Sequence, residues 1–234
     1  MQTKCEIQQT ADTLQTLKSE RTPRIFTDFI HGRWPLKYGN TVIKQKGSMI
    51  AEAGTPVSEC WYVFSGQLVT YGYSSSGEKR VWGIYRKGSV VFASECLNRQ
   101  NTDVFCEASV KTTLIQIPFS ELKTAFDSNF SVSGQLMKMI SAEYAAYFSF
   151  TRDLCTKSAF RRVCDILADL SSVFGEEEPG RTMISYRLSQ QSFADFAGIN
   201  RVTLVRILKE LREKNVIEVV NGYYAIKDMR AILF

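Results

Sequence analysis

Histidine is almost absent from this chain of 234 residues, which contains a single one, His31. One histidine cannot build a His-rich metal site, and it gives a Ser-His-Asp triad little support. The chain also lacks a glycine-rich phosphate loop, a paired-carboxylate motif, a nucleophile elbow and zinc-ligand spacing. We therefore predict that the protein is not an enzyme and that it uses no metal and no cofactor.

Closely spaced cysteines are missing as well. The six cysteines are scattered, and no two stand in the C-x-x-C spacing of a zinc ribbon or a cluster framework. In a reducing compartment most of them should be small buried hydrophobic residues. A redox-sensing pair formed by Cys96 and Cys106 is an open alternative.

Long apolar runs are also missing. No run approaches the roughly 18–20 residues of a membrane span, and residues 1–15 lack the apolar core of a secretory signal. We expect a cytoplasmic protein without membrane contact. The net charge of +5 is compatible with nucleic-acid binding but does not prove it. The length is sufficient for two domains.

Residues 188–211, LSQQSFADFAGINRVTLVRILKEL, have the pattern of two short helices joined by a tight turn. Ser189 is a good N-cap for the first helix and Asn200 for the second. Gly198 between them can adopt the positive φ that a sharp reversal requires. The apolar residues of the second helix form one stripe. This arrangement is the helix-turn-helix pattern. The stripe consists of Val202, Leu204, Val205, Ile207, Leu208 and Leu211.

Two β-rich runs, residues 216–220 and 223–226, follow around Asn221-Gly222 and predict a hairpin, the wing of a winged helix. Between residues 198 and 215, five positive and two negative side chains give a charge of +3, which suits contact with phosphate. A plain packing unit with a solvated face is the alternative. The predicted DNA contacts are Ser189, Gln190, Gln191, Asn200, Arg201, Val202, Thr203, Arg206 and Lys209.

Residues 38–119 contain short runs of Val, Ile, Tyr and Phe separated by glycines, which predict an all-β barrel or jelly roll that encloses a small volume. Its aromatic residues would suit an apolar or aromatic effector, although ordinary core is the alternative reading. The predicted pocket consists of Trp82, Tyr85, Phe92, Glu95, Cys96, Tyr144 and Tyr147.

Helical periodicity predicts a short helix over 120–126, one long helix over about 129–155 and another over 158–173. The long helix carries an apolar stripe at alternating steps of three and four, which suits pairing with its own copy in a parallel dimer. The stripe could instead pack on the roll, and both can hold at once. Its residues are Met137, Ile140, Tyr144, Tyr147, Thr151 and Leu154.

The remaining segments complete an α+β organisation of two domains, residues 1–155 and 156–234. Residues 1–20 should be a loose arm or short helix, and residues 25–34 a docking helix. Residues 175–180 are expected to be a solvated acidic loop, and residues 183–186 a strand that leads into the helix-turn-helix.

Three segments together resemble the CRP/FNR family of bacterial transcription regulators: GSMIAEAGTPVSECWYVFSGQLVTY with Gly54, Phe64 and Gly66, ASVKTTLIQIPFSELKTAF, and LSQQSFADFAGINRVTLVRILKELREKNVIEV. The resemblance covers about residues 38–230. It implies a β-roll sensor, a dimerisation helix and a winged helix-turn-helix that binds a two-fold related DNA site. It also implies RNA polymerase as a partner and control by an effector or a redox signal.

The resemblance breaks at two places. Members that bind cyclic AMP have Gly-Glu-Leu and then Arg-Ser or Arg-Thr, whereas this chain has Phe92–Leu97, FASECL, and then Thr102-Asp103. Without the arginine, and with Asp103 where the phosphate anion would lie, we predict no binding of cyclic AMP. The chain also lacks an N-terminal group of cysteines that could bind an iron–sulfur cluster. Its single histidine, His31, gives little support for haem binding.

The second departure lies in the recognition helix, where many members have Glu after the first Arg but this chain has Val202. Loss of the carboxylate removes a cytosine contact, and valine favours a thymine methyl group, so the half-site should differ from TGTGA or TTGAT. The resemblance implies a guanine or phosphate contact for Arg206 and a backbone contact for Thr203. The alternative function is a regulator whose winged domain binds a protein and not DNA.

Overall fold

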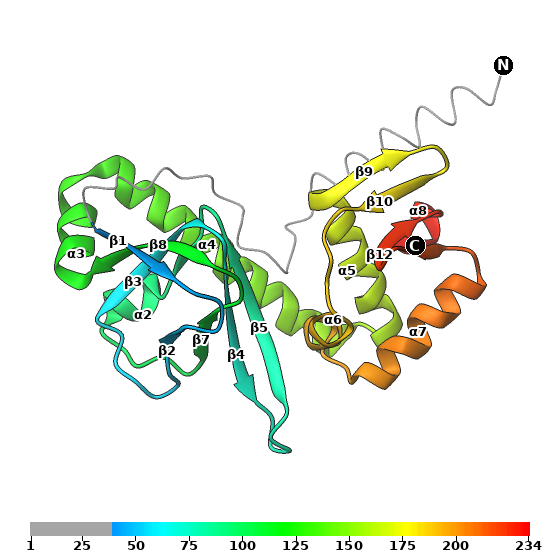
Figure 1. The fold of residues 1–234 in the computed structure, drawn as a ribbon, viewed down its shortest axis with the longest axis horizontal. Coiled ribbons are helices and arrows are strands. Elements are labelled where there is room, and N and C mark those ends of the chain that lie inside the picture. The colour runs from blue at the N-terminus through cyan, green and yellow to red at the C-terminus, as the bar shows by residue number, and fades with distance from the viewer. Residues whose placement is uncertain (1–38) are drawn as a thin grey trace. The chain divides into compact units, whose positions relative to one another are not determined.

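A computed structural model describes residues 39–234 (Figure 1). Within this range the chain forms two compact units, residues 39–147 and residues 148–234, which we call the roll unit and the winged unit. The division falls inside the long helix, between Tyr147 and Phe148. The predictions for residues 1–20, residues 25–34 and His31 lie outside the described residues.

The roll unit contains two four-stranded antiparallel sheets with the strand orders β1-β8-β3-β6 and β2-β7-β4-β5. Sequence neighbours are rarely sheet neighbours, as in a jelly roll, so the predicted β-roll is confirmed. The strands are β1 (Asn40–Lys44), β2 (Met49–Ala51), β3 (Glu59–Ser65), β4 (Gln67–Tyr73), β5 (Lys79–Arg86), β6 (Val90–Val91), β7 (Phe105–Ala108) and β8 (Thr112–Pro118).

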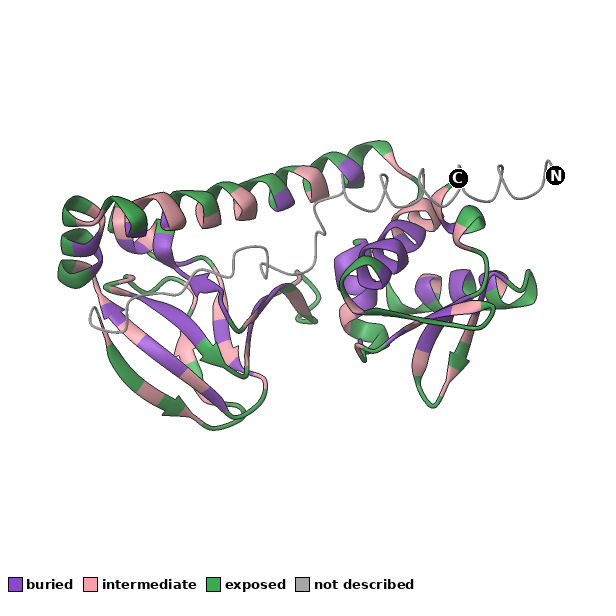
Figure 2. Cartoon of the chain, turned by 90° about the horizontal axis from the view of Figure 1, so that it is seen from above, coloured by how far each residue is buried: buried purple, intermediate pink, exposed green. Residues whose placement is uncertain are grey.

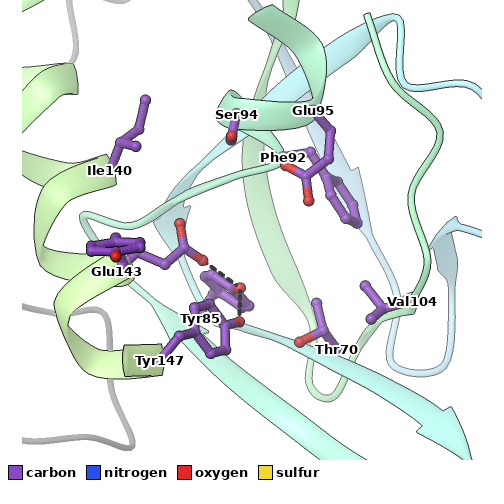
Figure 3. A pocket seen from close by; sticks show the side chains of 10 residues that line it. Thr70, Tyr85, Phe92, Ser94, Glu95, Val104, Ile140, Glu143 and Tyr147 are labelled. Atoms are coloured by element: carbon purple, nitrogen blue, oxygen red, sulfur yellow. Dashed lines mark hydrogen bonds between the residues drawn. The ribbon is translucent and has the colours of Figure 1, made fainter. Parts of the chain in front are cut away.

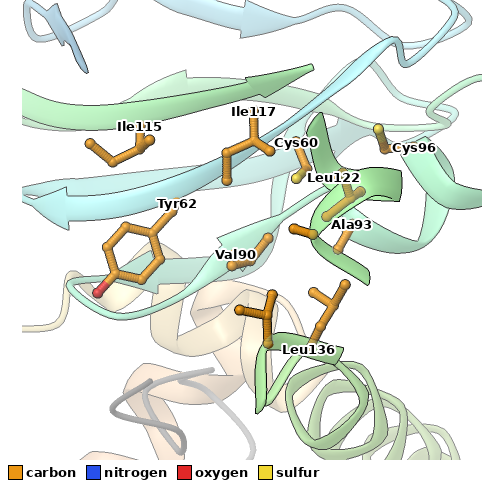
Figure 4. Packing of buried hydrophobic residues seen from close by; sticks show 11 residues of the cluster. Cys60, Tyr62, Val90, Ala93, Cys96, Ile115, Ile117, Leu122 and Leu136 are labelled. Carbon is orange, nitrogen blue, oxygen red and sulfur yellow. The ribbon is translucent and has the colours of Figure 1, made fainter. Parts of the chain in front are cut away.

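Strand β3 explains how one sheet serves two cores. Its alternate residues point to opposite faces, as in any strand. Trp61 and Val63 belong to a cluster between the two sheets, whereas Cys60 and Tyr62 belong to a cluster that includes residues of the helices. Because both faces are covered, the strand is a nearly continuous apolar run. Figure 4 shows the helix-side cluster.

Three helices accompany the roll: α2 (Ala93–Asn98), α3 (Phe119–Ser128) and α4 (Phe130–Thr156). The predictions of α3 and α4 are confirmed, whereas α2 was not predicted. Val132 and Leu136 of α4 are buried in the helix-side cluster, while Met137 and Tyr144 are 54% and 69% exposed. The long helix therefore packs on the roll along one face and leaves another face open, as the burial colours of Figure 2 show.

The winged unit combines α5 (Ala159–Phe174), α6 (Gln190–Ala197), α7 (Arg201–Glu213) and α8 (Met229–Leu233) with a sheet of order β11-β12-β10-β9. The predicted helix over 158–173 is confirmed as α5, and α8 was not predicted. The predicted wing is confirmed as β11 (Ile217–Val220) and β12 (Tyr223–Ile226). No helix among residues 39–234 combines the length and apolarity that crossing a membrane requires.

The prediction of an acidic loop at residues 175–180 is wrong. This segment forms β9 (Gly175–Glu178), which pairs antiparallel with β10 (Arg181–Ile184). Gly180, with φ of +78°, permits the tight turn between them. Arg181 forms a 2.7 Å ion pair with Glu178 and also pairs with Glu218 of β11, which offsets part of the negative charge.

Candidate functional site

Two capped helices build the helix-turn-helix of the winged unit. The Ser189 hydroxyl accepts a hydrogen bond from the Ser192 amide at 3.0 Å, and the Asn200 side-chain oxygen accepts one from the Thr203 amide at 2.8 Å. Gly198 between them has φ of +60°. The predicted caps and turn are therefore confirmed. The cap bonds also mean that these two side chains already have a structural role.

Arg162 of α5 holds the turn in place, although the sequence pattern did not single it out. Its Nε donates to the Ala197 carbonyl at 2.7 Å and its Nη1 to the Lys157 carbonyl at 2.6 Å. Leu154, which we predicted in the dimer stripe, contacts the same turn, because a Cβ on Gly198 would lie 2.3 Å from its Cδ2. A single arginine in an amphipathic helix carries no sequence signal for such a role.

Helix α7 separates its side chains into two faces. Leu204, Ile207, Leu208 and Leu211 are buried, as the predicted stripe requires, but Val202 is 80% exposed. Val202 was therefore wrongly included in the stripe, and its exposure agrees with the separate prediction that it faces outwards. The exposed face also carries cationic side chains. They are Arg201, Arg206 and Lys209.

The exposed face extends onto α6. Arg201 Nε donates to the Gln190 side-chain oxygen at 3.2 Å, so the two helices present these residues together. Gln191 is exposed as well, and its amide donates to Asp195 at 2.9 Å. The structure thus brings the predicted contact residues of α6 and α7 onto neighbouring positions of the winged unit, with Thr203 half-buried at the edge.

A groove of about 270 Å³ lies between α6, α7 and the wing. Its walls include Arg187 and Arg212, which sequence reasoning did not single out as a pair. Arg187 lies close to the backbone of the wing turn, since a Cβ on Gly222 would lie 3.1 Å from the Arg187 guanidinium. Asn221 and Gly222 both have positive φ, as a type I′ turn requires. In the sequence, the position of Arg187 two residues before the Ser189 N-cap could have indicated that it lies beside the helix-turn-helix.

A second cavity lies in the roll unit, between α4 and the roll, with a volume of about 350 Å³ (Figure 3). This volume is within the range of small-molecule sites. It includes the predicted pocket residues Tyr85, Phe92, Glu95, Tyr144 and Tyr147. The complete lining is Thr70, Tyr85, Phe92, Ser94, Glu95, Val104, Ile140, Glu143, Tyr144 and Tyr147.

Two predicted pocket residues lie elsewhere. Trp82 is 48% exposed on β5, with its indole nitrogen close to Gly72. Cys96 is fully buried in the helix-side cluster. Neighbours on a strand point to opposite faces, and α2 turns Cys96 into the core, so neither side chain lines the cavity. Asp103 also does not line the cavity, so the carboxylates there are Glu95 and Glu143.

Glu143 was missed, and it lies at one end of a hydrogen-bonded chain whose middle member is Tyr85. The Tyr85 hydroxyl donates to Glu143 at 2.8 Å and lies 3.2 Å from the Tyr147 hydroxyl, which must then donate to Tyr85. Burial raises the pKa of Glu143 to about 7, although the bond from Tyr85 opposes this shift. Burial and the nearby carboxylate also raise the pKa of Tyr147 to about 12. A glutamate directly before Tyr144 on a long helix matches no sequence motif.

The cysteines do not form the pair that we left open. Cys96 is buried in the helix-side cluster together with Cys60, whereas Cys106 belongs to the cluster between the sheets. Burial raises the pKa of the Cys106 thiol far above its usual range, which disfavours the reactive thiolate. In the described part of the chain, no group of His, Cys, Asp and Glu residues could hold a metal ion.

Comparison with known families agrees with both halves of this architecture. Residues 42–129 match the model of the cyclic nucleotide-binding domain, and residues 161–233 match the Crp-like helix-turn-helix domain. Electron transport regulator A of Shewanella oneidensis is 22% identical over 184 residues, which cover 79% of this chain and 73% of that protein. The global nitrogen regulator of Synechococcus elongatus is 24% identical over 197 residues, which cover 83% and 87%.

Solved structures show the same fold. A CooA mutant from Carboxydothermus hydrogenoformans aligns with a TM-score of 0.74 at 17% identity, over 86% of this chain and 90% of that one. A sensor roll, a long helix and a winged helix-turn-helix define a DNA-binding transcription regulator, and not an enzyme. The chain belongs to the CRP/FNR family.

Proposed function

We propose that the winged unit reads DNA through the exposed face of α7, with α6 and the wing positioning it on the sugar-phosphate backbone. The observation that supports this most directly is the placement of Arg201, Val202 and Arg206 on the side of α7 opposite its buried leucines. An arginine can bond two acceptors of guanine, and a valine methyl group can contact thymine. Gln190 supports Arg201 through its 3.2 Å hydrogen bond.

We assign the phosphate contacts to residues at the edges of this face. Lys209 lies further along α7, and Arg187 and Arg212 line the groove beside the wing. Arginine and lysine side chains at such positions bind phosphates without reading sequence. Ser189, Gln191, Asn200 and Thr203 lie at the starts of the two helices, where backbone amides can also face phosphate. These residues therefore fix orientation, and Arg201, Val202 and Arg206 supply specificity.

Dimerisation through α4 would place two such faces on one DNA molecule. Met137, Tyr144, Phe148 and Thr151 are exposed and recur at steps of seven, four and three along this helix, as a seam between two copies requires. Ile140, Tyr144 and Tyr147 of the predicted stripe also line the roll cavity, so this face of α4 would take part both in packing on the roll and in pairing. Two recognition helices about 34 Å apart would fit a two-fold related site in successive major grooves.

An effector in the roll cavity would control the DNA affinity, and RNA polymerase is the partner at the promoter. The cavity has walls from the roll and from α4, the helix that also carries the proposed dimer seam. A ligand that binds differently in two orientations of α4 shifts the equilibrium between them. The cavity thus provides a physical connection between a small molecule and the spacing of two DNA-reading helices.

Selection of genomic DNA fragments by the purified protein tests this proposal. The wild type should recover an inverted repeat, and an Arg201→Ala, Arg206→Ala double variant should lose at least about tenfold in affinity for it. Lys87→Ala, Lys111→Ala is the matched control, because it removes two exposed positive charges from the roll unit. Salt must be held constant, since phosphate contacts depend on it.

The alternative function, a winged unit that binds only protein, makes the opposite prediction. It requires that the double variant and its control behave alike and that no inverted repeat is recovered. Binding that depends on salt but not on sequence, equal in both variants, would contradict our assignment of Arg201 and Arg206.

A further inference from the structure

The roll cavity has an unusual chemical bias. Every polar side chain in its lining is a carboxylate or a hydroxyl: two glutamates, three tyrosines, one serine and one threonine. Neither lysine, arginine nor histidine contributes to it from the described residues. Carboxylates accept hydrogen bonds when ionised and cannot donate them. The cavity is therefore rich in acceptors and contains no positive charge to balance its two acids.

Two of these polar groups have no partner within the described residues. The Thr70 hydroxyl is buried, belongs to a residue that is 2% exposed, and has no hydrogen bond. The Glu95 carboxylate extends from α2 towards the same space as Glu143 and has no side-chain hydrogen bond or ion pair within residues 39–234 (Figure 3). Buried polar groups are normally satisfied, so the unpaired Thr70 hydroxyl is an exception that a ligand would explain, while the partly exposed Glu95 carboxylate is available to the same ligand.

We propose that this cavity binds a small organic cation: a protonated amine on an aromatic or apolar body. The ammonium group would donate hydrogen bonds to Glu143 and Glu95, and the body would lie against the aromatic walls. An ammonium group carries three donors, enough for two carboxylates and a hydroxyl such as Thr70. Aromatic faces also attract cations. The proposal rests on the proposed function, because it names the chemical class of the effector.

The same geometry argues against the other charge class. An anionic effector would have to approach two carboxylates in a site without a compensating cation, and like charges at short range in low dielectric repel strongly. A neutral ligand would avoid that repulsion but would leave Glu143 and Glu95 unbalanced. The cavity thus discriminates by charge first and by shape second, and the preferred order is cation, neutral molecule, anion.

Because Glu143 titrates near neutral pH, the affinity for a cation should depend on pH. The titratable groups that face Glu143 are Tyr85 from β5, Glu95 from α2, and Tyr144 and Tyr147 from α4. With its pKa near 7, Glu143 is mostly protonated at pH 6 and mostly ionised at pH 8. A cation binds the ionised form, so its affinity should rise about tenfold between these pH values. A neutral ligand should show no such rise.

Three probes of similar shape test the charge preference: 2-phenylethylamine, 2-phenylethanol and 3-phenylpropionate. Each is titrated into the full-length protein without DNA, and its dissociation constant is followed by protein-observed NMR at pH 6 and pH 8. We expect the amine to bind most tightly and the carboxylate most weakly, with the tenfold rise in affinity from pH 6 to pH 8 confined to the amine. Equal affinities for amine and alcohol, or a preference for the carboxylate, would overturn the proposal.

Substitutions of the two cavity glutamates test whether the amine binds in the roll cavity. Glu143→Gln should weaken amine binding about thirtyfold or more and abolish its pH dependence, because a buried ion pair loses one partner. Glu95→Gln, on a different element, is the second test in case the first variant folds poorly. Glu121→Gln removes an exposed glutamate of α3 and should leave the affinity unchanged. Amine affinity equal to the wild type in both pocket variants would refute the site.

The selection of genomic DNA fragments tests the proposed DNA-binding function independently of the proposed cation site. These titrations contain no DNA, so failure of the amine to bind says nothing against an inverted repeat recovered by the winged unit. Conversely, amine binding with the predicted pH signature supports the site even when Arg201→Ala, Arg206→Ala fails to change DNA selection.

Discussion

The DNA-reading face and the roll cavity differ in how the chain assembles them. The face consists mainly of one contiguous stretch, residues 189–213, which contains α6, α7, both N-caps and the turn. The cavity draws its walls from β4, β5, α2, the segment at Val104 and α4, which are spread over almost 80 residues of sequence. A site built from consecutive residues has a local pattern, whereas a site built from distant ones has none.

Charge shows the same contrast. The exposed face of α7 carries cationic side chains that stay in solvent, where their charge costs little. The cavity holds Glu143 where burial moves its pKa to about 7. Solvated charges are visible in composition, but a buried charge becomes informative only when its surroundings are known. Three substitutions, Phe193→Ala, Glu143→Gln and Asn200→Ala, test these differences between the winged unit and the roll cavity.

Phe193→Ala should destabilise the winged unit by about 3–5 kcal/mol, because a fully buried aromatic side chain leaves a cavity. Phe193 is completely buried and packs edge-on against Tyr224, with 5.8 Å between ring centroids. Trp61 and Trp82 lie in the roll unit and no tryptophan lies in residues 148–234, so tryptophan fluorescence does not report directly on the winged unit, whereas circular dichroism follows the helices. In urea, part of the helical transition should shift while the tryptophan transition remains.

Leu68→Ala, at a fully buried position of β4, is the reciprocal control, and it should shift the tryptophan transition. If both variants moved both transitions together, the two units would unfold as one, and the contrast between them would not extend to stability.

Glu143→Gln should make the protein more stable above pH 7, by about 1–3 kcal/mol. The folded pKa, about 7, is above the ordinary value of 4.5, so the folded state binds the proton more tightly than the unfolded state. The stability of the wild type should therefore fall as the pH rises from about 4.5 to 7, and the variant should lack this fall. Glutamine still accepts the bond from Tyr85.

Urea unfolding at several pH values measures this slope. Glu121→Gln on α3 should keep the slope of the wild type, since that side chain is exposed. Parallel curves for Glu143→Gln and the wild type would show that the buried carboxylate does not titrate in this range.

The comparison also explains which predictions succeeded. Caps, the turn glycine, the wing dipeptide and the period of α7 are local, so Ser189, Asn200, Gly198 and Asn221 could be identified from the sequence. The strands of the roll could be located because they are apolar runs between glycines. These elements also fix the fold class, since a roll, a long helix and a winged helix appear in that order.

The failures at the pocket were non-local. Cys96 and Trp82 are close in sequence to pocket residues, but α2 and the strand alternation turn them away. Glu143 lines the pocket because α4 packs on the roll, and no residue of α4 indicates this packing by itself. The failure at residues 175–178 was local, because this acidic segment forms a hairpin with the adjacent strand β10, in which Arg181 pairs with Glu178.

Asn200→Ala should have the smallest effect of the three, about 1 kcal/mol, through loss of the N-cap of α7. The Asn200 side chain accepts the Thr203 amide at 2.8 Å, and alanine cannot. Because we also place Asn200 at the DNA-reading face, this variant alone cannot separate a structural role from a binding role. The free energy of unfolding and the DNA affinity would both decrease.

Asn200→Asp separates the two roles. Aspartate caps helices as well as asparagine, and its charge is favourable at a helix N-terminus, so stability should stay within a few tenths of a kcal/mol of the wild type. The same charge would face phosphate, so DNA affinity should fall and salt dependence should change. Unfolding in urea and binding to the selected repeat measure the two effects. An Asn200→Asp protein with unchanged stability and unchanged DNA affinity would place Asn200 outside the interface and restrict its role to capping.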